Sequence, residues 1–302
     1  MASIAYKFET NFPAAPQDKS NSPCVDAPLG LSSILPGNEG EVLTALSAPS
    51  LTNVIMSGFV RDNGLVSALN RGRFYACRNQ QNKLEGVALI GHTILFEAFN
   101  EAAIQAFAAL ARREESPNLL MGEHTAVQKF WNYYAEKEQS PRLICPVLFL
   151  RRSEPFHENR SLQDLRPATQ SDLEHVVRAQ AAMALETSGV DPLKKDPVGF
   201  RNRYLRRIEK GRVWVLMKND RLVFKTDIIA DTPEATYIEG VYVSPEQRGK
   251  GIGRDCVSAL GRILLQHTRA MYLFVEQENT RTQSFYKNLG FNVGGQYDLL
   301  YF

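Results

Sequence analysis

Hydrophobic and polar residues alternate along this chain in short blocks, and their spacing predicts strands interspersed with helices. The run 236–243 is rich in β-branched and aromatic residues over a length typical of a buried strand. The segment 251–265 that follows places Ile252, Cys256 and Leu260 four positions apart, which is the spacing of a helix with one buried face. Repetition of such blocks predicts an α/β (α+β) protein.

The same spacing predicts further elements in both halves of the chain. In the first half we expect strands at 73–77, 84–90, 119–122 and 143–150, and helices at 51–60, 100–112 and 125–137. In the second half we expect a helix that ends near residue 186, helices at 198–210 and 280–288, and strands at 212–217, 221–229, 271–276 and 296–302.

The two halves have a similar order of elements. The segment 72–76 resembles 211–215, and each precedes a polar turn and a second strand. These similarities predict a weak internal duplication. Residues 11–36 contain five prolines and few large apolar groups, which favours an extended arm. We therefore expect an arm at 1–38, one domain at 39–152 and another at 163–302, separated by a linker.

Composition narrows the class of protein. The 302 residues are 44% hydrophobic and 23% charged, close to globular averages, and the net charge of +2 does not favour a nucleic acid or a membrane as partner. The unbroken apolar run 143–150 is too short to span a bilayer, and the first residues do not have the pattern of a secretory signal. Four widely spaced cysteines fit reduced thiols. We expect a cytoplasmic monomer or homodimer.

A glycine-rich turn at 248–254 connects the strand 236–243 to the helix at 251–265. Gly249, Gly251 and Gly253 alternate there and let the backbone approach a ligand closely. Backbone N–H groups at a helix start, together with the helix dipole, form an anion site suited to a pyrophosphate. Three basic residues add charge around this turn: Arg248, Lys250 and Arg254.

Two common phosphate motifs do not fit this turn. A P-loop requires Ser or Thr after Gly-Lys, whereas Gly249-Lys250 is followed by glycine. The dinucleotide fingerprint requires GxGxxG after the first strand, whereas this turn reads GxGxG and follows the fourth strand of its half. Both motifs are excluded by spacing.

The order Arg-x-x-Gly-x-Gly after a strand resembles motif A of the GNAT family of N-acetyltransferases, as read in Arg248–Gly253. A second family motif is matched downstream by Asn279, Tyr286 and Gly290-Phe291, and the resemblance covers about residues 163–302. The first half has no such turn, because the sequence between Ile94 and Asn100 is Leu-Phe-Glu-Ala-Phe. The whole chain thus resembles bacterial tandem-GNAT proteins with a degenerate first domain.

The resemblance implies two GNAT-like domains, each a twisted, mostly antiparallel sheet flanked by helices. It also implies acetyl-CoA as co-substrate, with its pyrophosphate on the glycine turn and its pantetheine paired beside the fourth strand. Gly240 in that strand is a natural place for a β-bulge that opens a slot. The residues implied at the cofactor are Val241, Tyr242, Val243, Arg248, Gly249, Lys250, Gly251, Ile252, Gly253, Arg254, Asn279 and Tyr286.

Acetyl transfer to an amine requires a base for the amine and a proton for the departing sulfur. The family's positions imply Glu239 as the base and Tyr286 as the acid, since a tyrosine with a pKa of ~10 stays protonated at neutral pH. Other interpretations stay open: Glu239 as a surface charge with Glu276 or Glu278 in its place, Tyr286 as a core aromatic, and Asn279 as a helix cap only.

Other candidate chemistry is absent from the sequence. The five histidines lack metal-ligand spacing, Cys256 lies on the apolar stripe of its helix, and no GxSxG nucleophile motif occurs. We expect no metal, and an amine acceptor that approaches near 186–191. The predicted function is acetyl transfer from acetyl-CoA to a primary amine of a small molecule or peptide. The alternatives are a non-catalytic acyl-CoA sensor and an acyltransferase with a longer acyl donor or an oxygen acceptor.

Overall fold

The computed structural model describes residues 30–34, 36–70, 72–113, 117–136, 139–157, 162 and 164–302. Its strands are β1 (Gly30–Ser33), β2 (Gly72–Arg78), β3 (Leu84–Gly91), β4 (Thr93–Ala98), β5 (Leu119–Glu123), β6 (Leu143–Arg152), β7 (Leu165–Pro167), β8 (Val213–Lys218), β9 (Arg221–Asp231), β10 (Thr236–Val243), β11 (Met271–Glu276) and β12 (Asn292–Tyr301). Its α-helices are α1 (Glu39–Ala45), α2 (Leu51–Asn63), α3 (Glu101–Ala111), α4 (His124–Tyr134), α5 (Leu173–Ser188), α6 (Pro192–Lys195), α7 (Pro197–Glu209), α8 (Ile252–Leu264) and α9 (Thr280–Asn288). Three single turns of 3-10 helix complete the elements: η1 (Ala68–Asn70), η2 (Gln170–Asp172) and η3 (Pro245–Gln247).

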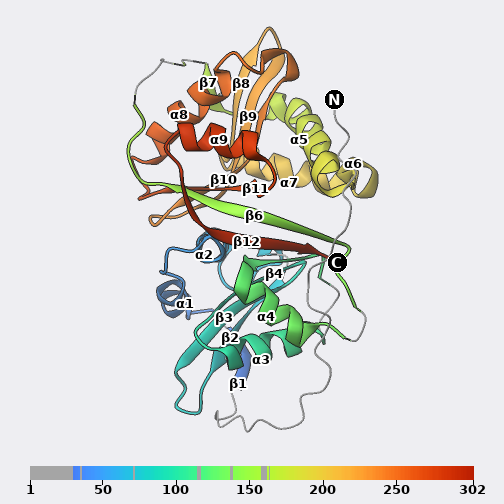
Figure 1. Ribbon diagram of the computed structural model, residues 1–302, viewed down its shortest axis with the longest axis vertical. Coiled ribbons are helices and arrows are strands. Elements are labelled where there is room, and N and C mark those ends of the chain that lie inside the picture. The colour runs from blue at the N-terminus through green and yellow to red at the C-terminus, as the bar shows by residue number, and fades with distance from the viewer. Residues whose placement is uncertain are drawn as a thin grey trace.

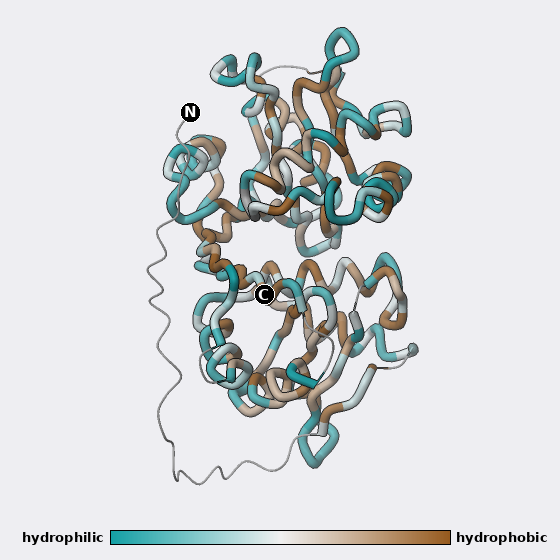
Figure 2. The backbone as a smooth tube through the Cα atoms, turned by 90° about the vertical axis from the view of Figure 1, so that its right-hand side faces the viewer, coloured by the Kyte–Doolittle hydropathy of each residue, from teal (hydrophilic) through white to brown (hydrophobic). Residues whose placement is uncertain are grey.

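The strands form one continuous sheet in the order β1-β2-β3-β4-β5-β12-β6-β11-β10-β9-β8-β7. Each half has the predicted twisted, mostly antiparallel sheet, and within the described residues the parallel pairs are β4–β5 and β10–β11. The helices flank this sheet in two lobes (Figure 1). Figure 2 shows hydrophobic segments concentrated in the strands and hydrophilic residues in the outer turns, as expected for a sheet with a buried core.

The two halves exchange their last strands at the centre of the sheet. β6 belongs to the first half by sequence, yet it pairs with β11, where Leu273 lies opposite Leu150. β12 ends the second half, yet it pairs with β5, where Leu300 lies opposite Leu120. Figure 1 shows β6 and β12 side by side between the lobes. The sequence did not predict this exchange, because strand periodicity does not encode the identity of a partner strand.

Helix α2 joins the two halves. It begins at Ser50, whose Oγ accepts a hydrogen bond from the Asn53 backbone N–H at 3.2 Å, a typical N-cap. Although it belongs to the first half, α2 packs on β4 and also on β9 and β10. A Cβ added at Gly58 would lie 2.8 Å from the Cβ of Ala230 on β9. This close approach buries α2 in a core shared by both halves.

Several elements differ from the sequence predictions at their ends. Gly30–Ser33, expected within the arm 1–38, form β1 and pair antiparallel with β2; residues 1–29 lie outside the described part. β4 was not predicted as a strand, and β12 begins at Asn292 instead of 296. In contrast, 236–243, 271–276 and 280–288 coincide with β10, β11 and α9. These three elements position the site.

Candidate active site

The predicted bulge at Gly240 is confirmed by the register of β10. Glu239 lies opposite Asp227 and Tyr242 lies opposite Lys225, so Gly240 and Val241 together face the single residue Thr226. Gly240 has a φ of +61°, a conformation that glycine adopts without steric cost. The bulge therefore bends β10 at the centre of its length.

β10 separates from β11 just before this bulge. The parallel pairing between them covers Thr236 and Tyr237 and does not extend beyond Tyr237 in the described residues. The segment 239–243 therefore pairs with β9 on one side and leaves its other edge open to an added strand. Val241 and Val243 pack partly against the core under α8 and α9. Tyr242 is half-buried, and burial raises the pKa of its phenol.

The glycine-rich turn forms the start of α8 immediately after this strand. Gly249 and Gly251 have φ values of +77° and +80°, and Gly251 is the N-cap of the helix. The first backbone hydrogen bond of the helix is donated by Asp255 N–H to Gly251 O at 3.0 Å. The N–H groups of 249–254 find no acceptor in the described part of the chain. An N-terminal turn with free N–H groups is the arrangement that binds a phosphate.

The third glycine of the turn has a different role. Gly253 lies within α8, and a Cβ added there would lie 3.1 Å from Cγ2 of Val243 and 3.6 Å from Cζ of Phe285. Gly253 thus lets α8 lie close against β10 and α9. The flanking Ile252 also packs against this core.

The basic side chains of the turn make local contacts. Arg248 Nε donates to Val243 O at 3.1 Å, which fixes the turn to the end of β10. Lys250 Nζ lies 3.4 Å from Gln247 Oε1, and Arg254 Nε lies 3.4 Å from Asp255 Oδ1. All three cations belong to the turn that carries the free N–H groups, but their roles in binding a phosphate stay predictions.

Asn279 is the N-cap of α9, and Tyr286 lies within that helix. Asn279 Oδ1 accepts a hydrogen bond from Thr282 N–H at 3.0 Å, so this residue is a helix cap. Tyr286 is 5% exposed, and its ring packs 5.0 Å from Phe285 and 5.5 Å from Phe291, centroid to centroid. Burial raises the pKa of the Tyr286 phenol, which keeps its proton in place.

Glu239 lies one residue before the bulge, and Tyr237 O–H donates a hydrogen bond to its carboxylate. The carboxylate keeps contact with solvent, yet protein surrounds it closely enough to raise its pKa. The Tyr237 hydrogen bond and the positive charge of Arg207 act in the opposite direction. A carboxylate with a raised pKa is a better proton acceptor than an ordinary surface glutamate. Exposure does not separate Glu239 from its rival Glu278, since both are exposed, whereas Glu276 at the end of β11 is half-buried.

A buried polar network beneath the bulge was missed in the sequence. Lys225 Nζ donates to both oxygens of Asp227 at 2.8 Å and to Gln180 Oε1 at 2.6 Å, and Lys225 is fully buried. Tyr204 O–H also donates to Asp227, at 3.0 Å. The signal for this network was the pair of charges at alternate positions within the apolar run of β9, which places both on one face of the sheet.

This network lies directly against the bulge. A Cβ added at Gly240 would lie 2.9 Å from Gln180 Oε1, 3.0 Å from Lys225 Nζ and 3.2 Å from Asp227 Oδ2. Arg207 extends the network from α7, since its guanidinium donates to Tyr204 O–H at 3.2 Å and lies 3.6 Å from Asp227 Oδ2. The candidate base and the bulge thus share one polar environment.

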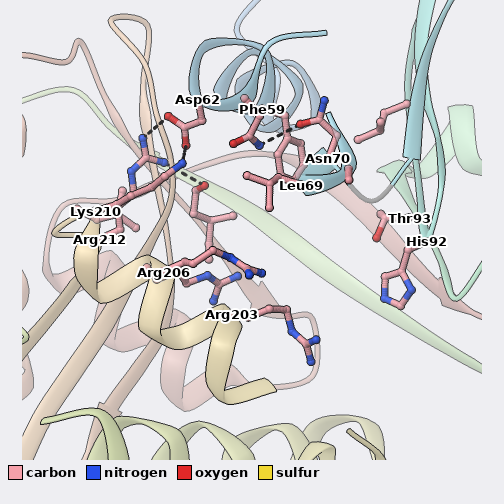
Figure 3. Close-up of a pocket in the computed structure, with 16 residues that line it drawn as sticks. Phe59, Asp62, Leu69, Asn70, His92, Thr93, Arg203, Arg206, Lys210 and Arg212 are labelled. Carbon is pink, nitrogen blue, oxygen red and sulfur yellow. Dashed lines mark hydrogen bonds and ion pairs between the residues drawn. The ribbon is translucent and has the colours of Figure 1, made fainter. Parts of the chain in front are cut away.

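A second feature missed in the sequence is a pocket between α2 and α7, with a volume of about 350 Å³. Arg203, Arg206 and Lys210 extend into it from the region of α7, opposite Leu69 and His92 of the other lobe (Figure 3). Sequence spacing did not indicate it, because its walls come from segments more than a hundred residues apart.

Among the described residues, neither a metal site nor a reactive cysteine is a further candidate for catalysis. No group of three His, Cys, Asp or Glu side chains among them could hold a metal ion. Cys256 is fully buried, and burial raises its pKa to about 12, which fits a core residue. Within the same residues, no helix has the length and apolar character needed to cross a membrane.

Comparison with known proteins agrees with this geometry. Residues 182–291 match the family model described as the acetyltransferase (GNAT) family, a range that includes the bulge, the glycine turn and Tyr286. This part of the chain is thus similar to the GNAT family of acetyltransferases. No curated protein matches the chain in a sequence comparison.

Solved structures extend the likeness in fold to both halves. A Drosophila protein is similar with a TM-score of 0.64 and 9% identity, covering 90% of this chain and 98% of its own. A GCN5-related N-acetyltransferase from Sphaerobacter thermophilus has a TM-score of 0.55 and 12% identity, covering 90% and 95%. A tandem GNAT protein from the clavulanic acid biosynthesis pathway has a TM-score of 0.55 and 14% identity, covering 91% and 98%. The chain thus has a tandem GNAT-like fold.

Proposed function

We propose that this protein is an acetyl-CoA-dependent N-acetyltransferase that acts on a primary amine through its second half, residues 163–302. This proposal rests on one observation, which is that the open strand edge and the phosphate-binding turn are continuous. The open edge of β10 after Gly240 leads directly into the free N–H groups at 249–254. An extended pantetheine along the open edge of β10 and a pyrophosphate on the N–H groups of 249–254 would lie in one line.

Within this proposal, residues 241–243 present backbone groups to the pantetheine amides. The N–H groups of 249–254 bind the pyrophosphate, with Arg248, Lys250 and Arg254 supplying positive charge. Ile252 and Gly253 form the first turn of the helix behind the phosphates, and Asn279 holds the start of α9 near the cofactor. Acetyl-CoA supplies an acetyl group activated as a thioester.

Glu239 and Tyr286 perform the proton transfers in this proposal. Glu239, directly or through one water, removes a proton from the amine, whose nitrogen then attacks the thioester carbon. The carbon–sulfur bond breaks, and Tyr286 donates its phenolic proton to the departing sulfur. The raised pKa of Glu239 makes it a stronger base, and the raised pKa of Tyr286 keeps its phenol protonated at neutral pH.

The acceptor would approach over the end of α5. Glu186 lies close enough to Tyr242 for its charge to contribute to the raised pKa of that phenol, after burial and the nearer charges. Carboxylates at 186–191 suit a cationic amine. Asp191 also has a structural role, since its Oδ1 accepts from Leu193 N–H at 2.9 Å and caps α6.

The first half, proposed as a degenerate GNAT-like domain at 39–152, lacks the features that would hold CoA. β4 separates from β5 after Ile94, much as β10 separates from β11. However, β4 pairs with β3 without a register shift, and Asn100 caps α3 where the second half has its glycine turn. A cytoplasmic location and a monomeric or homodimeric state stay predictions from composition.

The proposal is tested by thiol release from acetyl-CoA over a panel of primary amines, with product mass measured for acetyl and longer acyl donors. We expect turnover with at least one amine and a product heavier by one acetyl group. Tight CoA binding without turnover on any amine, together with no effect of Tyr286→Phe, would instead favour the acyl-CoA sensor. A product from a longer donor or an oxygen acceptor would assign the other alternative.

A further inference from the structure

The pocket between α2 and α7 is strongly cationic. Arg203, Arg206, Arg207, Lys210 and Arg212 line it from the side of α7 and β8, and Asp62 is the one carboxylate among its lining residues. A concave surface with charges of one sign concentrates ions of the opposite sign. The pocket is therefore a candidate site for an anion.

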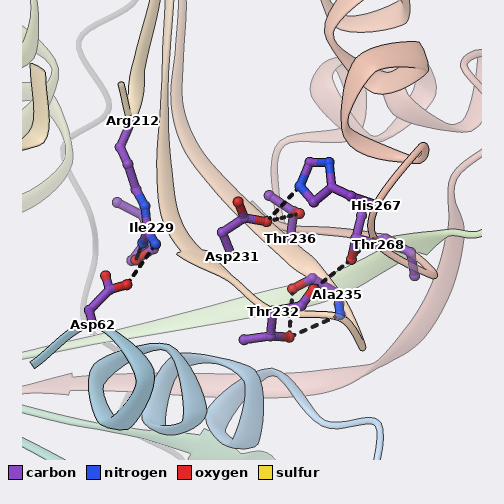
Figure 4. Close-up of polar contacts among 10 residues, drawn as sticks. Asp62, Arg212, Ile229, Asp231, Thr232, Ala235, Thr236, His267 and Thr268 are labelled. Atoms are coloured by element: carbon purple, nitrogen blue, oxygen red, sulfur yellow. Dashed lines mark hydrogen bonds and ion pairs between the residues drawn. The ribbon is translucent and has the colours of Figure 1, made fainter. Parts of the chain in front are cut away.

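The carboxylate of Asp62 is already shared by two cations. Arg212 NH2 lies 2.8 Å from Asp62 Oδ1, and Lys210 Nζ lies 3.8 Å from Oδ2. Figure 4 shows the contact between Asp62 and Arg212 beside Ile229, whose carbonyl oxygen accepts from Arg212 at 3.5 Å. Asp62 thus links the two lobes at the edge of the pocket through Arg212 and Lys210. Its carboxylate forms no ion pair with the other arginines of the pocket in the described part of the chain.

Of the remaining arginines, two are already paired with carboxylates outside the pocket lining. Arg203 NH1 contacts the half-exposed Asp196 at 3.0 Å, and Arg207 contacts Tyr204 and Asp227. Arg206 has no hydrogen bond or ion pair with any residue that the structure describes. A guanidinium group offers five N–H donors in a planar fork that matches phosphate and carboxylate oxygens.

The opposite wall of the pocket carries no excess charge. Phe59 and Leu69 present apolar surface, and His92 and Thr93 present polar groups. In Figure 3, Leu69 and His92 lie on the far side of the pocket from the arginines. This combination suits a small molecule with an anionic group at one end and a less polar body.

We propose that this pocket is a binding site for a small molecule that carries a phosphate or carboxylate group, with the anion held by Arg203, Arg206 and Lys210. The site does not depend on the function proposed above, since it lies outside the glycine turn and the bulge. It is formed by both lobes, which gives the first half of the chain a role in ligand binding.

Arg207 connects this pocket to the network beneath Gly240. It lines the pocket and also contacts Tyr204 O–H and lies 3.6 Å from Asp227. An anion in the pocket competes with Asp227 for the charge of Arg207. The anionic group belongs either to the acceptor itself or to a separate anionic metabolite. The arginines would recognise both by the same chemistry.

The test is a calorimetric titration with inorganic pyrophosphate as the probe, at low ionic strength and with CoA present to compete for the glycine turn. We expect binding that weakens with added salt. Arg206→Gln and the double variant Arg203→Gln/Arg206→Gln should weaken it about tenfold or more, because a charge-assisted contact is lost at each position. Thermal unfolding of each variant checks that the fold is kept.

Two further variants test whether the loss of pyrophosphate affinity is specific to the pocket. Arg221→Gln removes an exposed arginine at the start of β9 outside the pocket, and Lys250→Gln removes a cation of the glycine turn. Arg221→Gln should leave pyrophosphate affinity within about twofold of the parent value. Lys250→Gln distinguishes the two anion sites, because it weakens binding of the probe only if the probe binds at the glycine turn. Equal weakening by Lys250→Gln would place the probe at the turn and overturn the proposal, as would affinity unchanged in Arg203→Gln/Arg206→Gln.

Kinetics then distinguishes the two sources of the anion. If the acceptor carries the anionic group, pyrophosphate should inhibit competitively against the amine identified in the panel. If a separate metabolite binds, pyrophosphate should change the rate without competing with the amine. If no amine is turned over, the proposed function fails while the titration still tests the pocket.

Discussion

Lys225 Nζ and Asp227 Oδ2 lie 2.8 Å apart on one face of β9, and both lie within 3.2 Å of the position that a Cβ would occupy at Gly240. A buried ion pair is thus in contact with the bulge that opens β10. The low polarity of the interior makes such a pair costly to separate, so it holds the bulge in one conformation.

Removal of one member of this pair should destabilise the protein strongly. Lys225→Met leaves the buried Asp227 with only the more distant Arg207, at 3.6 Å, as a cation among the described residues, and we expect a loss of about 3 kcal/mol in the free energy of unfolding. The double variant Lys225→Met/Asp227→Leu should lose less, because the buried carboxylate is removed together with its nearest cation, and Arg207, 37% exposed, keeps contact with water. Denaturant unfolding measures both, and an additive loss in the double variant would contradict the coupling.

Substitution of Gly251 should remove CoA binding without unfolding the protein. Valine is strained at a φ of +80°, and its side chain would occupy the space before the free N–H groups. We expect affinity for CoA at least about tenfold lower by calorimetry. Gly189→Ala is the matched control, since Gly189 also has a positive φ, of +69°, with open space around it, at the end of α5. Unchanged affinity in Gly251→Val would refute the phosphate-binding role of the turn.

Glu239→Gln should lower the rate of acetyl transfer about 100-fold while CoA affinity is kept. The protein that surrounds the carboxylate raises the pKa of Glu239 above its usual 4.5, and the base must be deprotonated to act. The parent rate should therefore fall as the pH falls through this raised pKa, with an acidic limb above 4.5 in the profile of kcat/KM. If Glu239→Gln keeps the same acidic limb in its pH profile of kcat/KM, the base is another group.

Tyr286→Phe should lower kcat about 100-fold with little change in stability, because the ring stays packed between Phe285 and Phe291. Tyr134→Phe is the matched control: it removes the hydroxyl of a buried tyrosine in an aromatic cluster of the first half. Equal rates for both variants would show that Tyr286 is a core aromatic only.

The Asp172–Arg166 pair predicts an acid-sensitive part of the stability. Burial acts to raise the pKa of Asp172, but hydrogen bonds from Arg166 and Thr169 hold it at about 2, below the usual 3.8. A carboxyl with a lowered folded pKa stabilises the protein above pH 3.8 and loses that contribution as the pH falls through 2. We expect Arg166→Gln to cost about 1–2 kcal/mol at pH 7, allowing for the solvent exposure of Arg166.

Arg201→Gln provides the comparison for that prediction. Arg201 pairs with Glu174 at 2.7 Å, but both side chains are exposed. Its loss should cost less than about 1 kcal/mol, as is usual for surface pairs. Equal costs at pH 7, or costs that do not converge as the pH approaches 2, would contradict the role of Asp172.

Much of the local architecture of the site was predictable. The φ of a residue in a bulge or at a helix start depends on its own side chain, so Gly240, Gly249 and Gly251 indicated those conformations directly. Gly253 differs, because its small size serves contacts with Val243 and Phe285 that come from distant parts of the chain. Asn279 shows the same limit, since its capping bond is local whereas contact with a cofactor stays a prediction.

The amino-acid sequence by itself determined most of the elements, with β1 and β4 among the exceptions, together with the bulge, the helix-start turn and the asymmetry between a half with that turn and a half without it. These features follow from backbone preferences and short-range periodicity. Only the tertiary structure decided that β6 and β12 exchange between the halves, that Lys225 and Asp227 meet beneath Gly240, and that α2 and α7 enclose a cationic pocket. Strand pairing and burial depend on which distant surfaces exclude water together, and no local pattern encodes that choice.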